Sequence, residues 1–237
     1  TGTITQNKMK VKDYWRINKD ALHFFVRSCL LGNTASVVEK ANNDYEIIGD
    51  QTDGAMLAWA KHHEELAKTE GGRVLDEYVF DSATKTITTL WHHGEHEYAF
   101  VRGAPEFILA KCKISDEERA KVNAQFETFA KAGLRTIGFA YKREQHIANK
   151  NRESLETELT FLGLMAIYDP PRLETKEAIR KAHSAGILVS MVTGDNEFTA
   201  LTLAREVGLI EKDEDVVTGE DLEKLTDEEL SSILLKT

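Results

Sequence analysis

The chain has 237 residues, of which 40 are acidic and 30 are lysine or arginine, so its formal charge is −10. A surface with this acidic excess is not suited to coating DNA, RNA or an anionic lipid layer. Hydrophobic residues make up 41%, which is typical of a globular protein. No segment approaches the ~18 consecutive apolar residues that a membrane helix needs, and the length suits one large domain or two small ones.

Two further features bear on the origin of the chain. Cys29 and Cys112 are its only cysteines, too few for a disulfide framework, which favours a reducing compartment. The sequence begins Thr1-Gly2-Thr3, without an initiator methionine or a signal peptide. We interpret it as a piece of a longer protein.

The middle of the chain is predicted to form an antiparallel sheet. Five segments are rich in Val, Ile, Thr and Tyr, as strands are: residues 73–80, 85–92, 96–102, 134–141 and 159–168. His93-Gly94-Glu95 is expected to turn the chain between the second and the third of them.

Two helices are predicted between these strands. Pro105 suits the first position of a short helix over residues 106–111. Ser115 and Glu118 form a capping box that begins a second helix, and Gly133 is expected to end it.

The pattern changes after Asp169-Pro170-Pro171-Arg172. Helices are predicted over residues 174–185 and 197–207. Between them, the apolar run 187–192 is typical of a parallel strand buried on both faces. This alternation indicates a doubly wound α/β sheet, followed by an acidic and helical tail over residues 218–236.

Two short segments have the chemistry of a phosphate site. Thr193-Gly194-Asp195 follows the predicted strand 187–192, and ligands of open α/β sheets bind at the carboxyl ends of strands. Its hydroxyl, its glycine and its carboxylate at a helix N-terminus suit a phosphate with Mg²⁺, although an aspartate that merely caps the helix explains the pattern equally well. Thr1-Gly2-Thr3-Ile4-Thr5 offers similar chemistry, unless it is a disordered terminus.

Nucleotide recognition needs an aromatic platform and cations. Phe80, Lys85, Arg102 and Arg135 lie on or beside the predicted strands. The alternative is that Phe80 belongs to the core and the three cations are solvated.

Seven motifs, in chain order, resemble those of the cytoplasmic catalytic segment of P-type cation-transporting ATPases. They are Thr1-Gly2-Thr3-Ile4-Thr5-Gln6-Asn7-Lys8-Met9, Gly49-Asp50-Gln51-Thr52-Asp53-Gly54-Ala55, Phe80-Asp81-Ser82-Ala83-Thr84-Lys85, Arg102-Gly103-Ala104-Pro105-Glu106, Gly133-Leu134-Arg135, Asp169-Pro170-Pro171-Arg172 and Thr193-Gly194-Asp195. The first resembles the phosphorylation motif Asp-Lys-Thr-Gly-Thr-Leu-Thr without its first two residues. The resemblance runs nearly end to end.

The resemblance implies an α/β protein of two domains. Residues 10–168 would form an α+β nucleotide-binding domain with an antiparallel sheet. This domain would be inserted into a phosphorylation domain of haloacid-dehalogenase-like, doubly wound α/β fold. Residues 1–9 and 169–237 would be parts of that second domain.

The resemblance also implies the site residues. Those at the nucleotide would be Asp53, Phe80, Lys85, Arg102, Gly103, Arg135, Asp169 and Arg172. Those around the γ-phosphate would be Thr3, Thr193, Gly194 and Asp195, and the backbone of Thr1 would help to hold Mg²⁺. Phe80 would stack on adenine, and Arg135 would reach the phosphates.

The sequence departs from the family pattern in ways that limit its chemistry. The family's nucleophile is an aspartate that takes the phosphoryl group, and the motif places it two residues before Thr1. The later Gly-Asp-Gly-x-Asn-Asp motif, which binds Mg²⁺, is absent. Arg102 stands for a lysine, Thr84 for an arginine and Asp53 for a glutamate. We therefore expect this piece to bind ATP or ADP with Mg²⁺ but not to hydrolyse it through an aspartyl-phosphate.

The function that the resemblance implies is that of an ATP-driven cation pump, with calcium as the favoured ion. The chain would be a monomeric cytoplasmic part of an integral protein of the bacterial plasma membrane. Its partners would be the pump's own transmembrane and actuator domains, and not nucleic acid. The alternatives are a haloacid-dehalogenase-type phosphatase with a large cap domain and a non-catalytic interaction domain whose acidic helices bind a partner.

Overall fold

The computed structural model describes residues 3–40, 44–67, 71–193 and 197–210, with residues 217, 218, 222, 225, 226 and 229. The chain divides into two compact units. The sheet unit comprises Lys8–Phe129 and Arg135–Tyr168. The helical unit comprises the described parts of Thr1–Asn7, Ala130–Leu134 and Asp169–Thr237. Each unit is described by itself.

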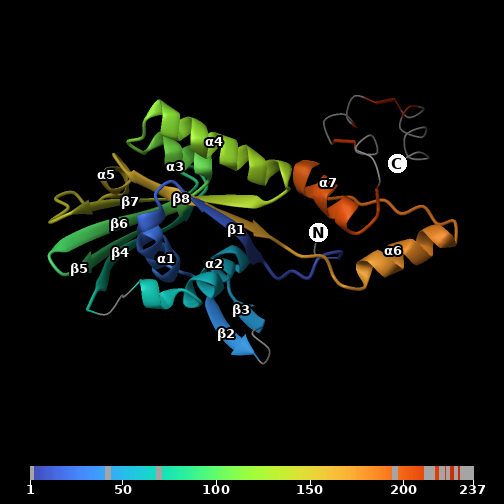
Figure 1. The fold of residues 1–237 in the computed structure, drawn as a ribbon, viewed down its shortest axis with the longest axis horizontal. Helices are drawn as coiled ribbons and strands as arrows, with labels where there is room; N and C mark the ends of the chain where they lie inside the picture. The colour runs from blue at the N-terminus through green and yellow to red at the C-terminus, as the bar shows by residue number, and fades with distance from the viewer. Residues whose placement is uncertain are drawn as a thin grey trace. The chain divides into compact units, whose positions relative to one another are not determined.

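A six-stranded antiparallel sheet forms the centre of the sheet unit, as far as the described residues show (Figure 1). Its order is β1-β8-β7-β6-β5-β4. The strands are β1 (Lys10–Arg16), β4 (Arg73–Asp81), β5 (Thr86–His93), β6 (His96–Gly103), β7 (Arg135–Glu144) and β8 (Thr160–Tyr168). The five strands predicted after residue 72 are confirmed, as is the hairpin that pairs His93 with His96.

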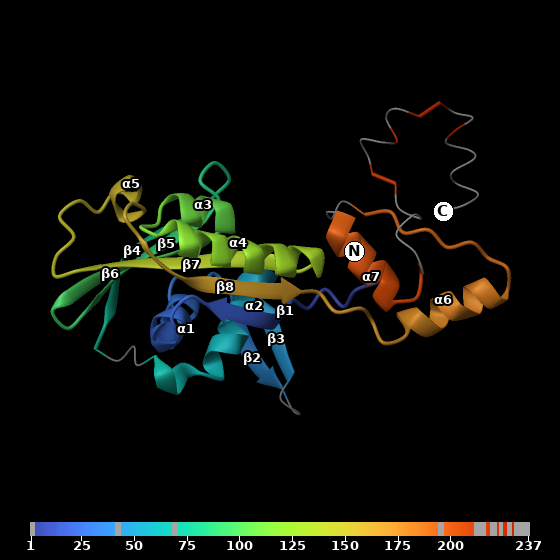
Figure 2. The same cartoon turned by 45° about the horizontal axis from the view of Figure 1, so that its top comes forward.

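Helices cover both faces of this sheet (Figure 2). One face carries α1 (Leu22–Leu30) and α2 (Gln51–Lys61), and the other carries α3 (Pro105–Ala110) and α4 (Asp116–Lys131). Pro105 occupies the first turn of α3, and the Ser115 hydroxyl donates to the Glu118 carboxylate in the first turn of α4, as the sequence predicted.

The main core lies between α1, α2 and the strands β7 and β8. Phe25 and Met56 of the helices are buried in one cluster with Phe139, Met165 and Ile167 of the strands. Alternate residues of a strand point to one face, which is how β8 presents Met165 and Ile167 together. This packing fixes α1 and α2 against the sheet.

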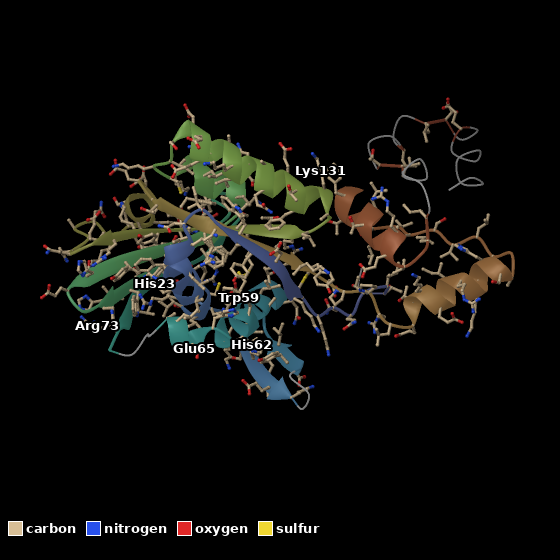
Figure 3. All side chains as sticks on the ribbon, viewed as in Figure 1. His23, Trp59, His62, Glu65, Arg73 and Lys131 are labelled. Atoms are coloured by element: carbon tan, nitrogen blue, oxygen red, sulfur yellow. The ribbon has the colours of Figure 1, made fainter. Side chains whose placement is uncertain are left out.

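A small hairpin, β2 (Ser36–Lys40) and β3 (Asp44–Ile48), lies beside the end of α2. The Tyr45 hydroxyl of β3 is 2.8 Å from Nε2 of His62, and the ring of Trp59 stacks on His63 with centroids 4.6 Å apart. His62 and Trp59 are labelled in Figure 3. Short 3-10 helices, η1 (Lys19–Ala21) and η3 (Glu64–Leu66), and the short helix α5 (Arg152–Leu155) complete the unit.

The helical unit contains α6 (Thr175–Ser184) and α7 (Glu197–Glu206), as predicted. Ile179, Leu203 and Val207 form its small core, against which Ile4, Met191 and Leu209 pack. Gly186 and Gly208 follow the two helices with positive φ, which suits glycine at a helix end.

The strand predicted over residues 187–192 is wrong: the segment has neither helix nor strand structure. Leu188 is 71% exposed and Val192 is 96% exposed. A buried parallel strand needs strands on both sides to bond its backbone, and the described residues of this unit contain no β-strand. The tail prediction for 218–236 falls almost wholly outside the described residues. No helix in the described part of the chain is both long enough and apolar enough to cross a membrane.

Candidate functional site

The register of the sheet brings four of the predicted site residues to one end of it. Gly103, the last residue of β6, pairs with Thr86 of β5 and with Gly138 of β7. Phe80 and Lys85 therefore lie at this end, one near the close of β4 and the other just before β5. Arg135 begins β7 at the same end.

The turn between β4 and β5, residues 81–85, carries the aromatic and one of the cations at its borders. The Lys85 amide donates to the Asp81 carbonyl at 2.7 Å, and the Ala83 amide donates to Oδ1 of Asp81 at 2.7 Å. Lys85 has φ of +54°, a conformation that L-residues other than glycine seldom adopt. Phe80 is 58% exposed, so its ring is not part of the core.

Gly103 is required by the close approach of β6 to this turn. A Cβ atom at Gly103 would lie 2.1 Å from the Lys85 carbonyl oxygen. The same oxygen accepts a hydrogen bond from the Ala104 amide at 3.1 Å. Any side chain at Gly103 would therefore push the turn out of place.

Arg102 is buried in the sheet unit. Its Nη1 donates to the carbonyl oxygens of Ser28, at 3.1 Å, and Leu31, at 3.0 Å. Its Nη2 donates to the Gly32 carbonyl at 2.6 Å and to Oδ1 of Asp53 at 3.1 Å. These carbonyls lie at the end of α1, where a cation is favoured by the helix dipole. The guanidinium thus joins β6 to both α1 and α2.

Asp53 is equally buried and completes this connection. Its Oδ2 accepts from the amide of Thr34 at 3.1 Å and from the Thr34 hydroxyl at 2.7 Å. Its own amide donates to Asp50, which caps α2. Burial raises the pKa of the neighbouring Cys29 thiol to about 12 even though Arg102 opposes the shift, so this thiol is neutral.

Arg135 lies at the surface and reaches the start of α2. Its Nη1 donates to the Thr52 hydroxyl at 3.0 Å. Thr52 was not among the predicted site residues, although it lies inside the motif that contains Asp53. The sequence shows the motif, but only the fold places Thr52 against Arg135.

The remaining predicted residues belong to the helical unit. Thr3 is exposed and Thr193 is half-buried, whereas Thr1, Gly194 and Asp195 lie outside the described residues. The Arg172 amide donates to the Ile4 carbonyl at 2.9 Å, so the segment after Asp169 runs beside the start of the chain.

Comparison with known proteins identifies the family. Residues 21–174, more than half of the chain, match the P-type ATPase cytoplasmic domain N. A probable cation-transporting P-type ATPase of Mycoplasma genitalium is 35% identical over 94% of this chain and 25% of the relative. A calcium-transporting ATPase of Bacillus subtilis is 31% identical over 99% of this chain and 31% of the relative. A sodium/potassium exporting P-type ATPase of Schizosaccharomyces pombe is 32% identical over 97% of this chain and 24% of the relative.

This chain therefore spans between 24% and 31% of the length of these relatives. With a family match over most of the sheet unit, and motifs in the family's order, the chain belongs to the P-type cation ATPases and carries their nucleotide-binding domain N.

Proposed function

We propose that the sheet unit binds ATP at the end of the sheet that carries Phe80, Lys85, Gly103 and Arg135. The observation that carries the proposal is the turn 81–85: an exposed phenyl ring, Phe80, directly precedes it on β4, and Lys85 ends it just before β5. An aromatic face suits adenine, and cations suit phosphates.

The residues of this end take different roles in the proposal. Phe80 stacks on the base, and Lys85 and Arg135 bind phosphate oxygens. Arg102 and Asp53 form the floor of the site: their charged groups bond each other and the end of α1, so they hold α2 and β6 in place. Gly103 keeps the turn close to β6.

The roles that we propose for residues of the helical unit rest on their sequence motifs. We assign Thr3, Thr193, Gly194 and Asp195 to the surroundings of the γ-phosphate, and Asp169 and Arg172 to the nucleotide. Residues 1–9 and 169–237 then belong to a haloacid-dehalogenase-like phosphorylation domain, into which residues 10–168 are inserted. Its doubly wound sheet is a proposal from the motifs, because the described residues of this unit show two helices and no sheet.

The described residues do not fit a protein cage for Mg²⁺. No group of three or more His, Cys, Asp or Glu side chains in the described ranges could hold a metal ion. Mg²⁺ commonly binds through substrate phosphates and few protein ligands, so we assign it to the triphosphate of ATP. The predicted contact from the Thr1 backbone lies outside the described residues.

We infer that the whole protein is a cation pump driven by ATP through an aspartyl-phosphate. The pump then lies in a bacterial plasma membrane, and this chain is its cytoplasmic part. Its partners are the pump's transmembrane and actuator domains. The relatives' names specify calcium, sodium/potassium or only a cation, so calcium is the finer prediction, from the motifs alone. The domain N match favours this over a haloacid-dehalogenase-type phosphatase or an interaction domain.

Titration of the chain with ATP tests the site, with Phe80→Ala as the variant. Loss of the stacking platform should weaken binding by roughly 1–3 kcal/mol, measured by isothermal titration calorimetry. Val79→Ala is the matched control, because Val79 is the neighbouring exposed apolar residue of β4, at 67% exposure. Equal affinity of Phe80→Ala and the parent chain would contradict the stacking assignment. Absence of any nucleotide binding by the parent would overturn the proposed function.

A further inference from the structure

A buried carboxylate lies behind the turn 81–85 and has no role in the proposed site. Glu156, the residue after α5, is 2% exposed. Its Oε1 accepts from the hydroxyl of Thr88 at 2.6 Å, from the hydroxyl of Thr86 at 3.0 Å and from Nε of Arg152 at 2.8 Å. Its Oε2 accepts from Nζ of Lys111.

These four partners keep Glu156 charged. Burial alone would raise the pKa of its carboxyl group, but hydrogen bonds from Lys111, Thr88 and Arg152 outweigh burial and lower the pKa. A buried charge is tolerated when its hydrogen-bonding capacity is filled, and removing one member of such a network leaves the others uncompensated. Glu156 therefore orders the groups around it.

The groups that Glu156 orders reach the turn at both ends. Nη1 of Arg152 lies 3.6 Å from Oδ2 of Asp81, the first residue of the turn. Nη2 of Arg152 donates to the Thr86 carbonyl at 2.5 Å, at the start of β5. The Thr86 hydroxyl lies 3.0 Å from the hydroxyl of Thr84, inside the turn.

The same carboxylate also holds the segment that follows Gly103. Lys111 directly follows α3, and α3 begins two residues after Gly103. The amide of Leu159, just before β8, donates to the Lys111 carbonyl at 2.9 Å. The turn 81–85 and the end of β6 contact each other at the Lys85 carbonyl. Glu156 therefore stabilises both of them, through Arg152 and through Lys111.

We propose that Glu156 is a positioning residue for nucleotide binding, which sets the turn that presents Phe80 and Lys85 without touching the nucleotide itself. This inference rests on the proposed function of the turn. The juxtaposition carries it: the hydrogen-bonded network on one buried carboxylate contacts both borders of the turn, at Asp81 and at Thr86.

The chain contains a matched control in Glu97. This carboxylate is also buried, at 6% exposure, and accepts from the Ile147 amide at 2.8 Å and from Nζ of Lys150 at 2.7 Å. As with Glu156, burial alone would raise its pKa, but the bonds from Lys150 and Ile147 lower it. Glu97 lies at the opposite end of β6 from Gly103, six residues or about 20 Å along the strand.

The experiment compares Glu156→Gln with Glu97→Gln in the full chain. Both variants should unfold at lower urea concentration, because each loses a charged acceptor. Only Glu156→Gln should weaken ATP binding, by about threefold to tenfold, as expected when one or two side chains must be ordered again on binding. Without nucleotide, Glu156→Gln should also speed amide hydrogen exchange at Ala83 and Lys85, whereas Glu97→Gln should leave both amides unchanged.

Each outcome decides between the claims. Unchanged exchange at Ala83 and Lys85 in Glu156→Gln, or equal losses of ATP affinity in both variants, overturns the positioning role. If the parent chain binds no ATP, the proposed function fails, while the exchange measurement still shows whether Glu156 sets the turn. If Glu156→Gln does not fold, Arg152→Gln replaces it, with Lys150→Gln as its control, and the same results are expected.

Discussion

Two apolar segments of similar composition have opposite fates in this chain. In β8, residues 164–167 are each 0% exposed, and β8 lies between β1 and β7. In the helical unit, the run 187–192 forms no strand, and Leu188 and Val192 are largely exposed. An apolar run marks a segment suited to burial. Neighbouring strands on both sides, which β8 has, are what make it a strand.

The largest expected effect is a difference between two leucines. Leu164→Ala removes a fully buried side chain of β8 and should lower the free energy of unfolding by about 2–5 kcal/mol. Leu188→Ala should change it by less than about 0.5 kcal/mol, because the side chain is already exposed. Urea unfolding checks this by circular dichroism and by the fluorescence of Trp15, Trp59 and Trp91, which all lie in the sheet unit. Similar losses would mean that 187–192 is packed in solution.

A smaller effect is expected from two glycines. Gly103→Ala places a methyl group against the Lys85 carbonyl and should cost about 1–3 kcal/mol, with a loss of ATP affinity as the turn moves. Gly186, at φ of +73°, has no heavy atom within 4 Å of an added Cβ. Gly186→Ala should therefore cost only the backbone strain, about 1–2 kcal/mol, and leave ATP binding unchanged. Unaltered ATP affinity in Gly103→Ala would mean that the turn 81–85 is not part of the ATP-binding site.

The smallest effect on stability is expected at Lys85. Lys85→Gly relieves a left-handed backbone, worth about 1–2 kcal/mol, but adds freedom to the unfolded chain, which costs about 0.4–1 kcal/mol. The second effect offsets only part of the first, so the unfolding midpoint should rise slightly. ATP affinity should nevertheless fall, because the ammonium group is gone. Calorimetric titration checks it, and full affinity with preserved stability would remove Lys85 from the phosphate site.

Most of the sheet unit after residue 72 was predictable from local signals. The strands β4 to β8 begin and end within three residues of the prediction, because alternation, the Gly94 turn and Pro105 all act over short distances. The strand β1 was not predicted. Its exposed Lys10 and Lys12 hide the pattern, and its pairing with β8 comes from a segment about 150 residues away.

Sequence motifs point to individual residues of the candidate site, but they do not show where these residues lie relative to one another. The motifs located Phe80, Lys85 and Arg135, and the register places them at one end of the sheet. The burial of Arg102 was not foreseen, because its acceptors are main-chain carbonyls at the end of α1, which have no sequence signature. The sequence analysis did not single out Glu156 for a similar reason: its partners come from β5, from α5 and from the residue after α3, and no short motif contains them.

The pairing of β1 with β8 brings the two ends of the sheet unit together, which affects how the unit can be inserted into another domain. Lys10 pairs with Tyr168, and the backbone of Gln6 bonds Pro170 at 2.9 Å, so the chain enters and leaves along two adjacent strands. Their separation is one strand spacing, about 4.8 Å. Another domain can therefore contain this unit as an insertion between two points of its chain that lie about 4.8 Å apart. Adjacent ends of this kind are what the proposed insertion of residues 10–168 into a second domain requires.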